Sequence, residues 1–146
     1  MIIRPVRPED KANWLPLWQG YLTFYEEENL PEHVTETLWA RFFDAAEPVH
    51  ALVAEENGVL LGLVHYIFHR NTWMVEDVCY LEDLFTAEAA RGKGVGRALI
   101  EAVYAAARAA GSTRVYWMTH ETNKTAQALY NNVAEKSGFI QYRKQV

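Results

Sequence analysis

Two adjoining stretches organise this chain: residues 80–86, with the sequence YLEDLFT, and residues 91–97, with the sequence RGKGVGR. The first combines apolar and acidic residues and predicts a strand. The second carries glycine at every other position from 92 to 96, which lets a backbone turn tightly and approach a ligand closely. The alanine-rich residues 98–110 predict a helix, whose opening N–H groups and positive dipole end favour an anion. The sequence therefore predicts a strand, a turn and a helix that together bind phosphate.

The glycine turn is also basic, because it includes Arg91, Lys93 and Arg97. Two common nucleotide-binding motifs do not fit it. The dinucleotide fingerprint requires glycine where Arg97 stands, and the Walker loop requires serine or threonine where Gly94 stands. We therefore expect the turn to hold the phosphates of its ligand in another way.

The length and composition of the chain indicate one globular domain. A chain of 146 residues has the size of a single domain, and 50% of its residues are hydrophobic, which suits a packed core. The net charge of −5 disfavours nucleic acid and favours cationic partners. No apolar run approaches the ~18 residues of a membrane span, and the first residues do not resemble a signal peptide. We therefore expect one cytoplasmic domain over residues 1–146 that binds neither nucleic acid nor a membrane.

Apolar periodicity and turn residues predict the other elements. Asn57-Gly58 lies between two apolar runs, which is the strongest short signal for a β-hairpin. Asn123 suits a helix N-cap, and Ser137-Gly138 suits the end of that helix. The predicted strands are residues 2–6, 49–55, 59–69, 75–86, 113–119 and 139–143. The predicted helices are residues 9–25, 31–46, 98–110 and 123–137.

The order of these elements predicts the fold class. Strands that follow one another through short connections predict antiparallel pairing, whereas a strand, a helix and another strand around the glycine turn predict one parallel βαβ step. We therefore expect an α/β domain with a mixed, mainly antiparallel central sheet flanked by helices. The parallel step should lie at the phosphate-binding turn.

The glycine turn, from Arg91 to Gly96, resembles the Arg/Gln-x-x-Gly-x-Gly/Ala signature of the GNAT superfamily of N-acetyltransferases. Residues 81–86, LEDLFT, resemble the central strand of its polyamine and diamine acetyltransferase branch. Downstream, Asn123 precedes residues 128–130 by the spacing typical of the family. The chain thus resembles the superfamily in its turn, its central strand and a later helix.

The resemblance covers residues 1–146 and is most specific over residues 80–142. It implies a GNAT-like fold and acetyl-CoA as the cosubstrate. In that family, the strand before the turn lends backbone groups to the pantetheine arm and splays from the next parallel strand. The residues that the resemblance implies for coenzyme binding are Leu84, Phe85, Thr86, Arg91, Gly92, Lys93, Gly94, Val95, Gly96, Arg97, Asn123, Lys124, Thr125 and Ala126.

Tyr130 is the general acid that the resemblance implies, because it follows Ala/Ser-x-x-Leu/Phe at residues 126–129. A phenol, with an ordinary pKa of about 10, is protonated at neutral pH and can donate to a departing thiolate. The alternative is a structural tyrosine on an amphipathic helix. For Asn123 the alternative is simple helix capping, and His120 is either a second candidate base or an ordinary loop histidine.

Four acidic residues are candidates for binding the acceptor. Glu82 and Asp83 lie in an otherwise apolar strand, where buried carboxylates are costly unless they are paired or line a wet cleft. The resemblance implies that Glu82 binds or deprotonates the amine of the acceptor, against a structural hydrogen-bonding role. Glu27 and Glu28 follow the first helix. Their charge and the resemblance together imply that they line the entrance for a cationic acceptor, and the alternative is a solvated loop.

No metal site is expected from the sequence. His65 and His69 share one face of a strand but lack a third ligand and a neighbouring glutamate base. The single Cys79 cannot form an internal disulfide, and no basic partner near it in sequence would make it reactive. We expect it to be an inert thiol.

The sequence as a whole predicts an acetyl-CoA-dependent N-acetyltransferase that acts on a primary amine of a small molecule, such as a polyamine, a diamine or a lysine-like compound. Transfer would be direct, in a ternary complex. The alternatives are an enzyme for protein amino termini or lysines, and a catalytically silent acyl-CoA-binding module. One departure is that residues 131–137 precede Gly138-Phe139, which predicts about one more helical turn than most relatives have. A homodimer is expected, because such enzymes are commonly dimers.

Overall fold

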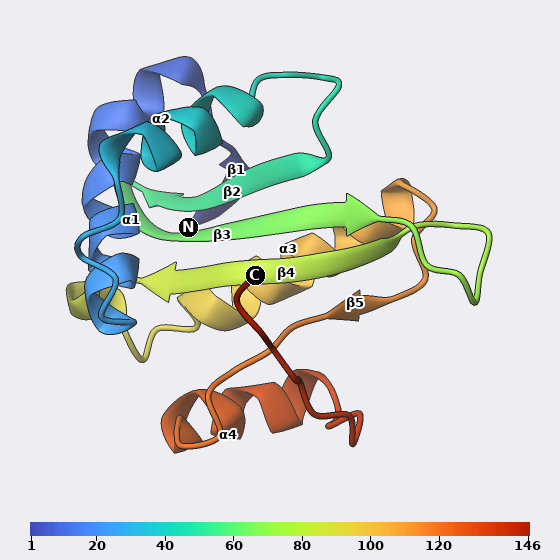
Figure 1. Ribbon diagram of the computed structural model, residues 1–146. Helices are drawn as coiled ribbons and strands as arrows, with labels where there is room; N and C mark the ends of the chain where they lie inside the picture. The colour runs from blue at the N-terminus through green and yellow to red at the C-terminus, as the bar shows by residue number, and fades with distance from the viewer.

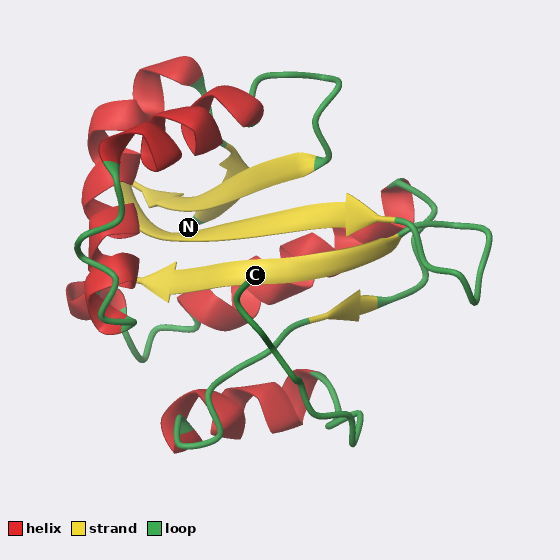
Figure 2. Cartoon of the chain, viewed as in Figure 1, coloured by secondary structure: helices red, strands yellow, loops and turns green.

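The computed structural model describes residues 1–146 as one mixed sheet with helices on both faces (Figures 1 and 2). The strands are β1 (Ile2–Pro5), β2 (Val49–Glu56), β3 (Val59–His69), β4 (Val78–Thr86) and β5 (Val115–Tyr116). The helices are α1 (Lys11–Phe24), α2 (Glu32–Arg41), α3 (Val95–Ala109) and α4 (Lys124–Val133), with single 3-10 turns η1 (Pro8–Asp10) and η2 (Glu88–Ala90). No helix is both long and apolar enough to cross a bilayer.

The sheet has the order β1-β2-β3-β4-β5, antiparallel throughout except for the parallel pair of β4 and β5. The predicted fold class is therefore confirmed, including the parallel step around the glycine turn. The hairpin predicted at Asn57-Gly58 is also present. Both residues have positive φ angles, 51° and 79°, as a two-residue turn between twisted strands requires.

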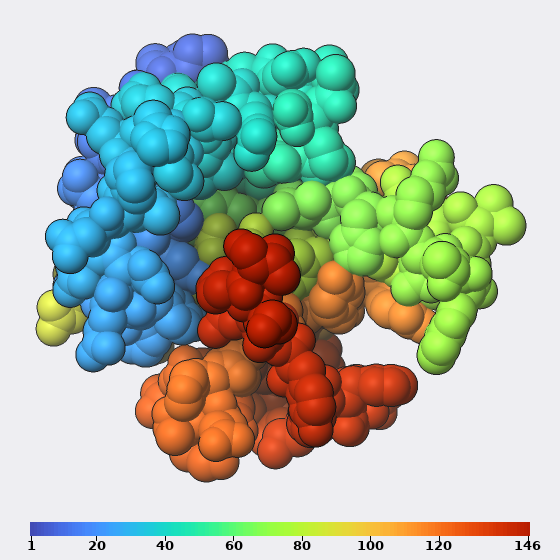
Figure 3. Space-filling view, in the orientation of Figure 1, coloured from blue at the N-terminus to red at the C-terminus, as the bar shows by residue number.

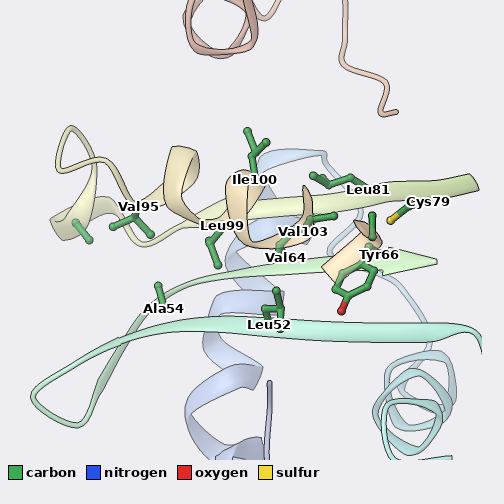
Figure 4. Close-up of a cluster of buried hydrophobic side chains, with 12 residues drawn as sticks. Leu52, Ala54, Val64, Tyr66, Cys79, Leu81, Val95, Leu99, Ile100 and Val103 are labelled. Carbon is green, nitrogen blue, oxygen red and sulfur yellow. The ribbon is translucent and has the colours of Figure 1, made fainter. Parts of the chain in front are cut away.

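Each face of the sheet has its own apolar core, because successive strand residues point to opposite faces. On one face lies α3, whose buried side chains recur at helical spacing and meet those of β2, β3 and β4 (Figure 4). On the other face lie α1 and α2, which bury a tryptophan-rich cluster. The α3-face cluster is Leu52, Ala54, Val64, Tyr66, Cys79, Leu81, Ala90, Val95, Leu99, Ile100, Val103 and Ala107. The α1-face cluster is Val6, Trp14, Leu17, Trp18, Trp39, Ala51, Val53, Leu60 and Leu63.

Glu82 forms a β-bulge in β4. Asp83 pairs with His65 and Leu81 pairs with Tyr66, so that Glu82 has no partner on β3. A bulge bends the strand and re-aims the neighbouring side chains. The acidic pair of the central strand therefore sits at an irregularity that the sequence pattern does not reveal.

Strands β4 and β5 separate soon after they meet. Only Cys79 with Val115 and Tyr80 with Tyr116 are paired, and β5 ends there. Residues 81–86 of β4 consequently have a neighbouring strand on the β3 side alone. The splay implied by the family resemblance is thus present, and it opens the edge of β4 that leads to the glycine turn.

Several predicted boundaries are wrong by a few residues. The second helix stops at Arg41 rather than at residue 46, and the central strand begins at Val78 rather than at residue 75. The helix after the glycine turn begins at Val95, three residues earlier than residue 98. The strand predicted at residues 113–119 shortens to Val115–Tyr116, because the splay removes its partner.

The prediction for the end of the chain is wrong. Helix α4 stops at Val133, and Ala134 is extended, so the extra residues 134–137 add no helical turn and Ser137-Gly138 does not end the helix. Helices in proteins depend on a packed apolar face, and these residues supply none. The predicted strand at residues 139–143 does not form, because no neighbouring strand pairs with it. The end of the chain lies on the molecular surface (Figure 3).

Candidate active site

The glycine turn presents a row of free backbone donors. Gly92 and Gly94 have φ angles of 77° and 80°, a left-handed conformation that other residues adopt only with strain. Outside the helices and strands, no backbone hydrogen bond has a donor among residues 92–97; the first is Ala98 N–H, which donates to Gly94 O at 3.0 Å. Donors without acceptors at the start of a helix fit the oxygens of a diphosphate. The residues present therefore fit the diphosphate of a coenzyme.

The three basic side chains of the turn differ in their surroundings. Arg97 pairs with Glu101 at 3.2 Å, which offsets its charge. Arg91 donates from Nε to Thr86 O at 3.4 Å and lies over the ring of Phe85, 5.8 Å from its centre. Lys93 is exposed and takes part in no ion pair. Lys93 is therefore the cation best able to meet a phosphate.

Helix α4 faces the splay from the side of the glycine turn. The Asn123 side chain accepts a hydrogen bond from Ala126 N–H at 3.4 Å, so its capping role is present. Tyr104 of α3 donates to Val133 O at 2.8 Å and anchors the end of the helix. A contact of Asn123, Lys124, Thr125 or Ala126 with a coenzyme remains a prediction.

Tyr130 is half-buried on α4, with its ring edge-on to Trp117 at 5.4 Å between centres. Burial raises the pKa of Tyr130 to about 12, and Tyr25, the residue that follows α1, adds to the effect. The phenol therefore keeps its proton at neutral pH.

The acidic pair Glu82 and Asp83 lies on the part of β4 that has no partner on β5. The pKa of Glu82 is raised, first by loss of hydration and then by the charge of Asp83, although the residue as a whole is exposed. Burial and the charges of both carboxylates raise the pKa of Tyr21 on α1 and that of Tyr80 on β4, the latter to about 12. The bulge thus gathers two carboxylates and two phenols at one place.

Asp83 is hydrogen-bonded to His65, which is in turn bonded to Trp14, and neither His65 nor Trp14 was predicted from the sequence to belong to the site. His65 Nδ1 lies 2.9 Å from Asp83 Oδ2, and Trp14 Nε1 donates to His65 Nε2 at 3.1 Å. Asp83 is 8% exposed, His65 1% and Trp14 not at all. No sequence signal could have revealed this series of hydrogen bonds. Its three residues lie on three different elements and meet only through the register of β3 with the bulged β4.

The remaining candidates lie apart from this cluster. Glu27 and Glu28 are exposed beyond α1, and Glu28 borders a hollow with Gln19, Leu22 and Thr23, so that their role in binding the acceptor stays a prediction. His120 is exposed and bonds Thr122 Oγ1 at 2.7 Å. Cys79 is fully buried, and burial raises the pKa of its thiol to about 12, which agrees with an inert thiol.

The structure contains no group of three potential metal ligands among its His, Cys, Asp and Glu residues. A shallow hollow lined by Glu32, His33, Glu36, Thr37 and Ala40 lies over α2 and includes none of the predicted site residues. The predicted site instead borders the open edge of β4, between the glycine turn, the end of α1 and α4.

The splayed sheet, the free donors of the turn and the proton-bearing phenol beside it define a group-transfer enzyme built around a diphosphate-containing coenzyme. Residues 14–134 match the Acetyltransferase (GNAT) family, and the chain belongs to this family of acetyl-CoA-dependent N-acetyltransferases. The chain is 38% identical to the D-amino-acid N-acetyltransferase HPA3 of Saccharomyces cerevisiae over 99% of its own length and 90% of that protein. It is 26% identical to the thialysine N-epsilon-acetyltransferase of Mus musculus over 97% and 90%.

Solved structures agree with this assignment. A crystal structure of a probable acetyltransferase superposes with a TM-score of 0.86 at 25% identity, covering 100% of this chain and 98% of that one. The structure of AAC(6')-Iy in complex with a CoA-containing bisubstrate analog superposes with a TM-score of 0.84, covering 99% and 98%. At 21% identity, the second likeness concerns the fold.

Proposed function

We propose that this protein transfers the acetyl group of acetyl-CoA directly to a primary amine of a small, cationic molecule. The observation that carries the proposal is the open edge of β4, which has free phosphate donors at one end and two carboxylates at the other. The two ends suit the two substrates of a ternary complex. The printed activities of the two named relatives, on D-amino acids and on thialysine, support a small amine as the acceptor.

The coenzyme side consists of the glycine turn and the edge of β4. Backbone N–H groups of residues 92–97, with Lys93 and Arg91 beside them, would hold the diphosphate. The unpaired edge of Leu84, Phe85 and Thr86 offers backbone groups to an amide-containing arm. When bound, acetyl-CoA supplies an acetyl group activated as a thioester.

Tyr130 is the proposed general acid. Its raised pKa, about 12, keeps the hydroxyl protonated at working pH, so that it has a proton to give to the departing sulfur. Tyr130 packs edge-on against Trp117 and is half-buried, so that its side chain is partly shielded from bulk water. A positioned general acid contributes about 10²- to 10⁴-fold to a rate.

Glu82 is the proposed base for the amine, and Asp83 the proposed binding group for it. A carboxylate with a raised pKa accepts protons more readily near neutral pH than an ordinary one does. Asp83 is more deeply buried and is suited to hold an ammonium group beside Glu82. Glu27 and Glu28 would then add negative charge near the end of α1.

The proposal is tested by a thiol-release assay with acetyl-CoA against D-amino acids, thialysine, diamines, polyamines and peptides with free amino termini, beside calorimetric titration of the coenzyme. Turnover with small amines alone supports the proposal, and turnover with peptides alone replaces it with a protein acceptor. Coenzyme binding without any turnover would indicate a silent binding module.

The acid is tested by Tyr130→Phe, with Tyr142→Phe as the matched control, because Tyr142 is 90% exposed near the end of the chain. We expect Tyr130→Phe to lower kcat by about 10²-fold or more and to leave coenzyme binding unchanged. The control should retain full activity. An unchanged kcat in Tyr130→Phe would remove Tyr130 from the mechanism without affecting the assignment of the substrates.

A further inference from the structure

The hydrogen bonds behind Asp83 fix the tautomer of His65. An indole nitrogen always carries its hydrogen and can only donate. Since Trp14 Nε1 points at His65 Nε2 at 3.1 Å, this nitrogen must accept and therefore carries no proton. The one ring proton of His65 then lies on Nδ1 and is donated to Asp83 Oδ2 at 2.9 Å. His65 is consequently a neutral donor to Asp83 and not its cationic partner.

The surroundings of His65 keep it in this state. Its ring centre lies 5.9 Å from that of Trp14, 5.2 Å from that of Trp18 and 5.0 Å from that of Phe42. With 1% of its surface exposed, His65 has no water to replace the indole donor. A second proton on the ring would require the Trp14 hydrogen bond to break inside an aromatic enclosure.

Asp83 is therefore a buried carboxyl group without a cationic partner. The structure gives it no Lys or Arg partner, and its only ion-pair candidate is the neutral His65. The titratable groups around it are Tyr21 of α1, Tyr25 just beyond α1, and Tyr80 and Glu82 of β4, and none of these is cationic. The β2 neighbour of His65 is Ala51, and the ring of Phe42, the residue that follows α2, packs against His65. A buried carboxylate in such surroundings is unfavourable until a positive charge approaches.

We propose that Trp14 and His65 are positioning residues that hold Asp83 as an uncompensated anion, and that the charge completing the site is the ammonium group of the acceptor. This inference rests on the proposed function and narrows it to amines that arrive protonated. It also gives the tryptophan a role other than packing: by occupying His65 Nε2, it prevents an internal imidazolium from taking the place of the substrate.

The first test is the protonation of His65 in the intact chain. Two-bond ¹⁵N–¹H NMR spectra of histidine-labelled protein, recorded from pH 5.5 to pH 8.5, distinguish the two tautomers and the imidazolium. We expect His65 to show a protonated Nδ1 and a bare Nε2 at every pH, with the signals of the exposed His33 and His120 as references. A protonated Nε2, or titration of His65 to an imidazolium, would overturn the inference.

The second test removes the indole donor with Trp14→Phe. The matched control is Trp18→Phe, because Trp18 lies on the same helix, is 6% exposed and donates its indole N–H to Thr35 at 3.1 Å instead of to His65. In Trp14→Phe, His65 Nε2 is free to take a proton at low pH and form an internal ion pair with Asp83. We expect KM for the amine to rise about tenfold between pH 8.5 and pH 6, beyond any change in the unmodified protein, with KM for acetyl-CoA unaffected.

In the control variant Trp18→Phe, KM for the amine should equal that of the unmodified protein at both pH 8.5 and pH 6. Equal behaviour of the two variants would mean that Trp14 acts through packing alone, and the inference would be wrong. The NMR experiment needs no turnover, so that a failure of the proposed reaction and a failure of this inference are seen separately. If Trp14→Phe does not fold, the NMR result on the unmodified chain decides the question.

Discussion

Two aspartates are almost equally buried in this molecule, but their surroundings differ in charge. Asp10 is 7% exposed and receives two bonds from the guanidinium of Arg4, at 2.8 and 3.0 Å. Asp83 is 8% exposed and is bonded by the neutral ring of His65, with the phenol of Tyr21 as a second neutral neighbour. Arg4 also reaches Glu55 at 3.3 Å, so the first region joins β1, η1 and β2 through a cation between two anions.

The difference separates structural stabilisation from ligand binding. Around Asp10 the protein supplies the opposite charge itself, and the Arg4 guanidinium lowers the pKa of Asp10 below its usual range. Around Asp83 the protein supplies only neutral donors and places the carboxylate at the opening of the splayed sheet. We therefore expect changes at the first site to alter the free energy of unfolding and changes at the second to alter the binding of the acceptor.

The largest expected effect is on stability, from Arg4→Met. Removing the cation leaves Asp10 buried and unpaired, which should lower the free energy of unfolding by about 3 kcal/mol. Urea unfolding measures the loss, and KM for the amine should not change in the folded protein. The double variant Arg4→Met with Asp10→Leu should recover most of the stability, since no buried charge then lacks a partner. A loss well under 1 kcal/mol in the single variant would contradict a stabilising role for this pair.

The next effect is on binding, from Asp83→Asn. The amide keeps the size of the side chain and an oxygen that accepts from His65, but it cannot pair with an ammonium group. We expect KM for the amine to rise about tenfold, the usual scale for one hydrogen bond to a charged group. Steady-state kinetics and urea unfolding on the same samples measure both quantities. Asp10→Asn is the matched control and should show the opposite result, a loss of stability with an unchanged KM.

The smallest effect is the dependence of stability on acid. An aspartate whose pKa is lower in the folded than in the unfolded chain, where it is about 3.9, stabilises the fold fully above that value. The contribution is lost as the pH falls through the lower, folded pKa of Asp10. Unfolding free energies between pH 6 and pH 2.5 should therefore fall less steeply in Asp10→Asn than in the unmodified protein. If the unfolding free energies of the two proteins fell in parallel with pH, Asp10 would not contribute to the loss of stability in acid.

The sequence predicted the parts of the fold whose signals are local. The hairpin at Asn57-Gly58 depends on two adjacent residues with positive φ, and the glycine turn with its helix depends on one continuous stretch. The free backbone donors of the turn could be predicted for the same reason, because donors at a helix start follow from glycine spacing alone. The role of Tyr130 stays a prediction, and it came from the family resemblance rather than from any property of the helix.

The rest depends on pairings between distant residues. The bulge at Glu82 exists only relative to β3, and the bond from Trp14 to His65 joins residues 51 positions apart. In the sequence, His65 was weighed only as a metal ligand with His69, since nothing local indicates a partnership with Asp83. The prediction for the end of the chain was wrong for the opposite reason. Residues 139–143 have strand-like composition, but a strand needs a neighbouring strand, and none is present.

The place of Cys79 gives the molecule an internal reporter. This single thiol is fully buried on β4 and pairs in register with Val115, where the only parallel contact of the sheet begins to open. Its sulfur lies in the cluster covered by α3, so a thiol reagent can reach it only when this packing opens locally. The labelling rate under native conditions therefore measures the free energy of local opening around β4, without any engineered probe. A slower rate with coenzyme present would show how strongly the bound ligand stabilises this part of the fold.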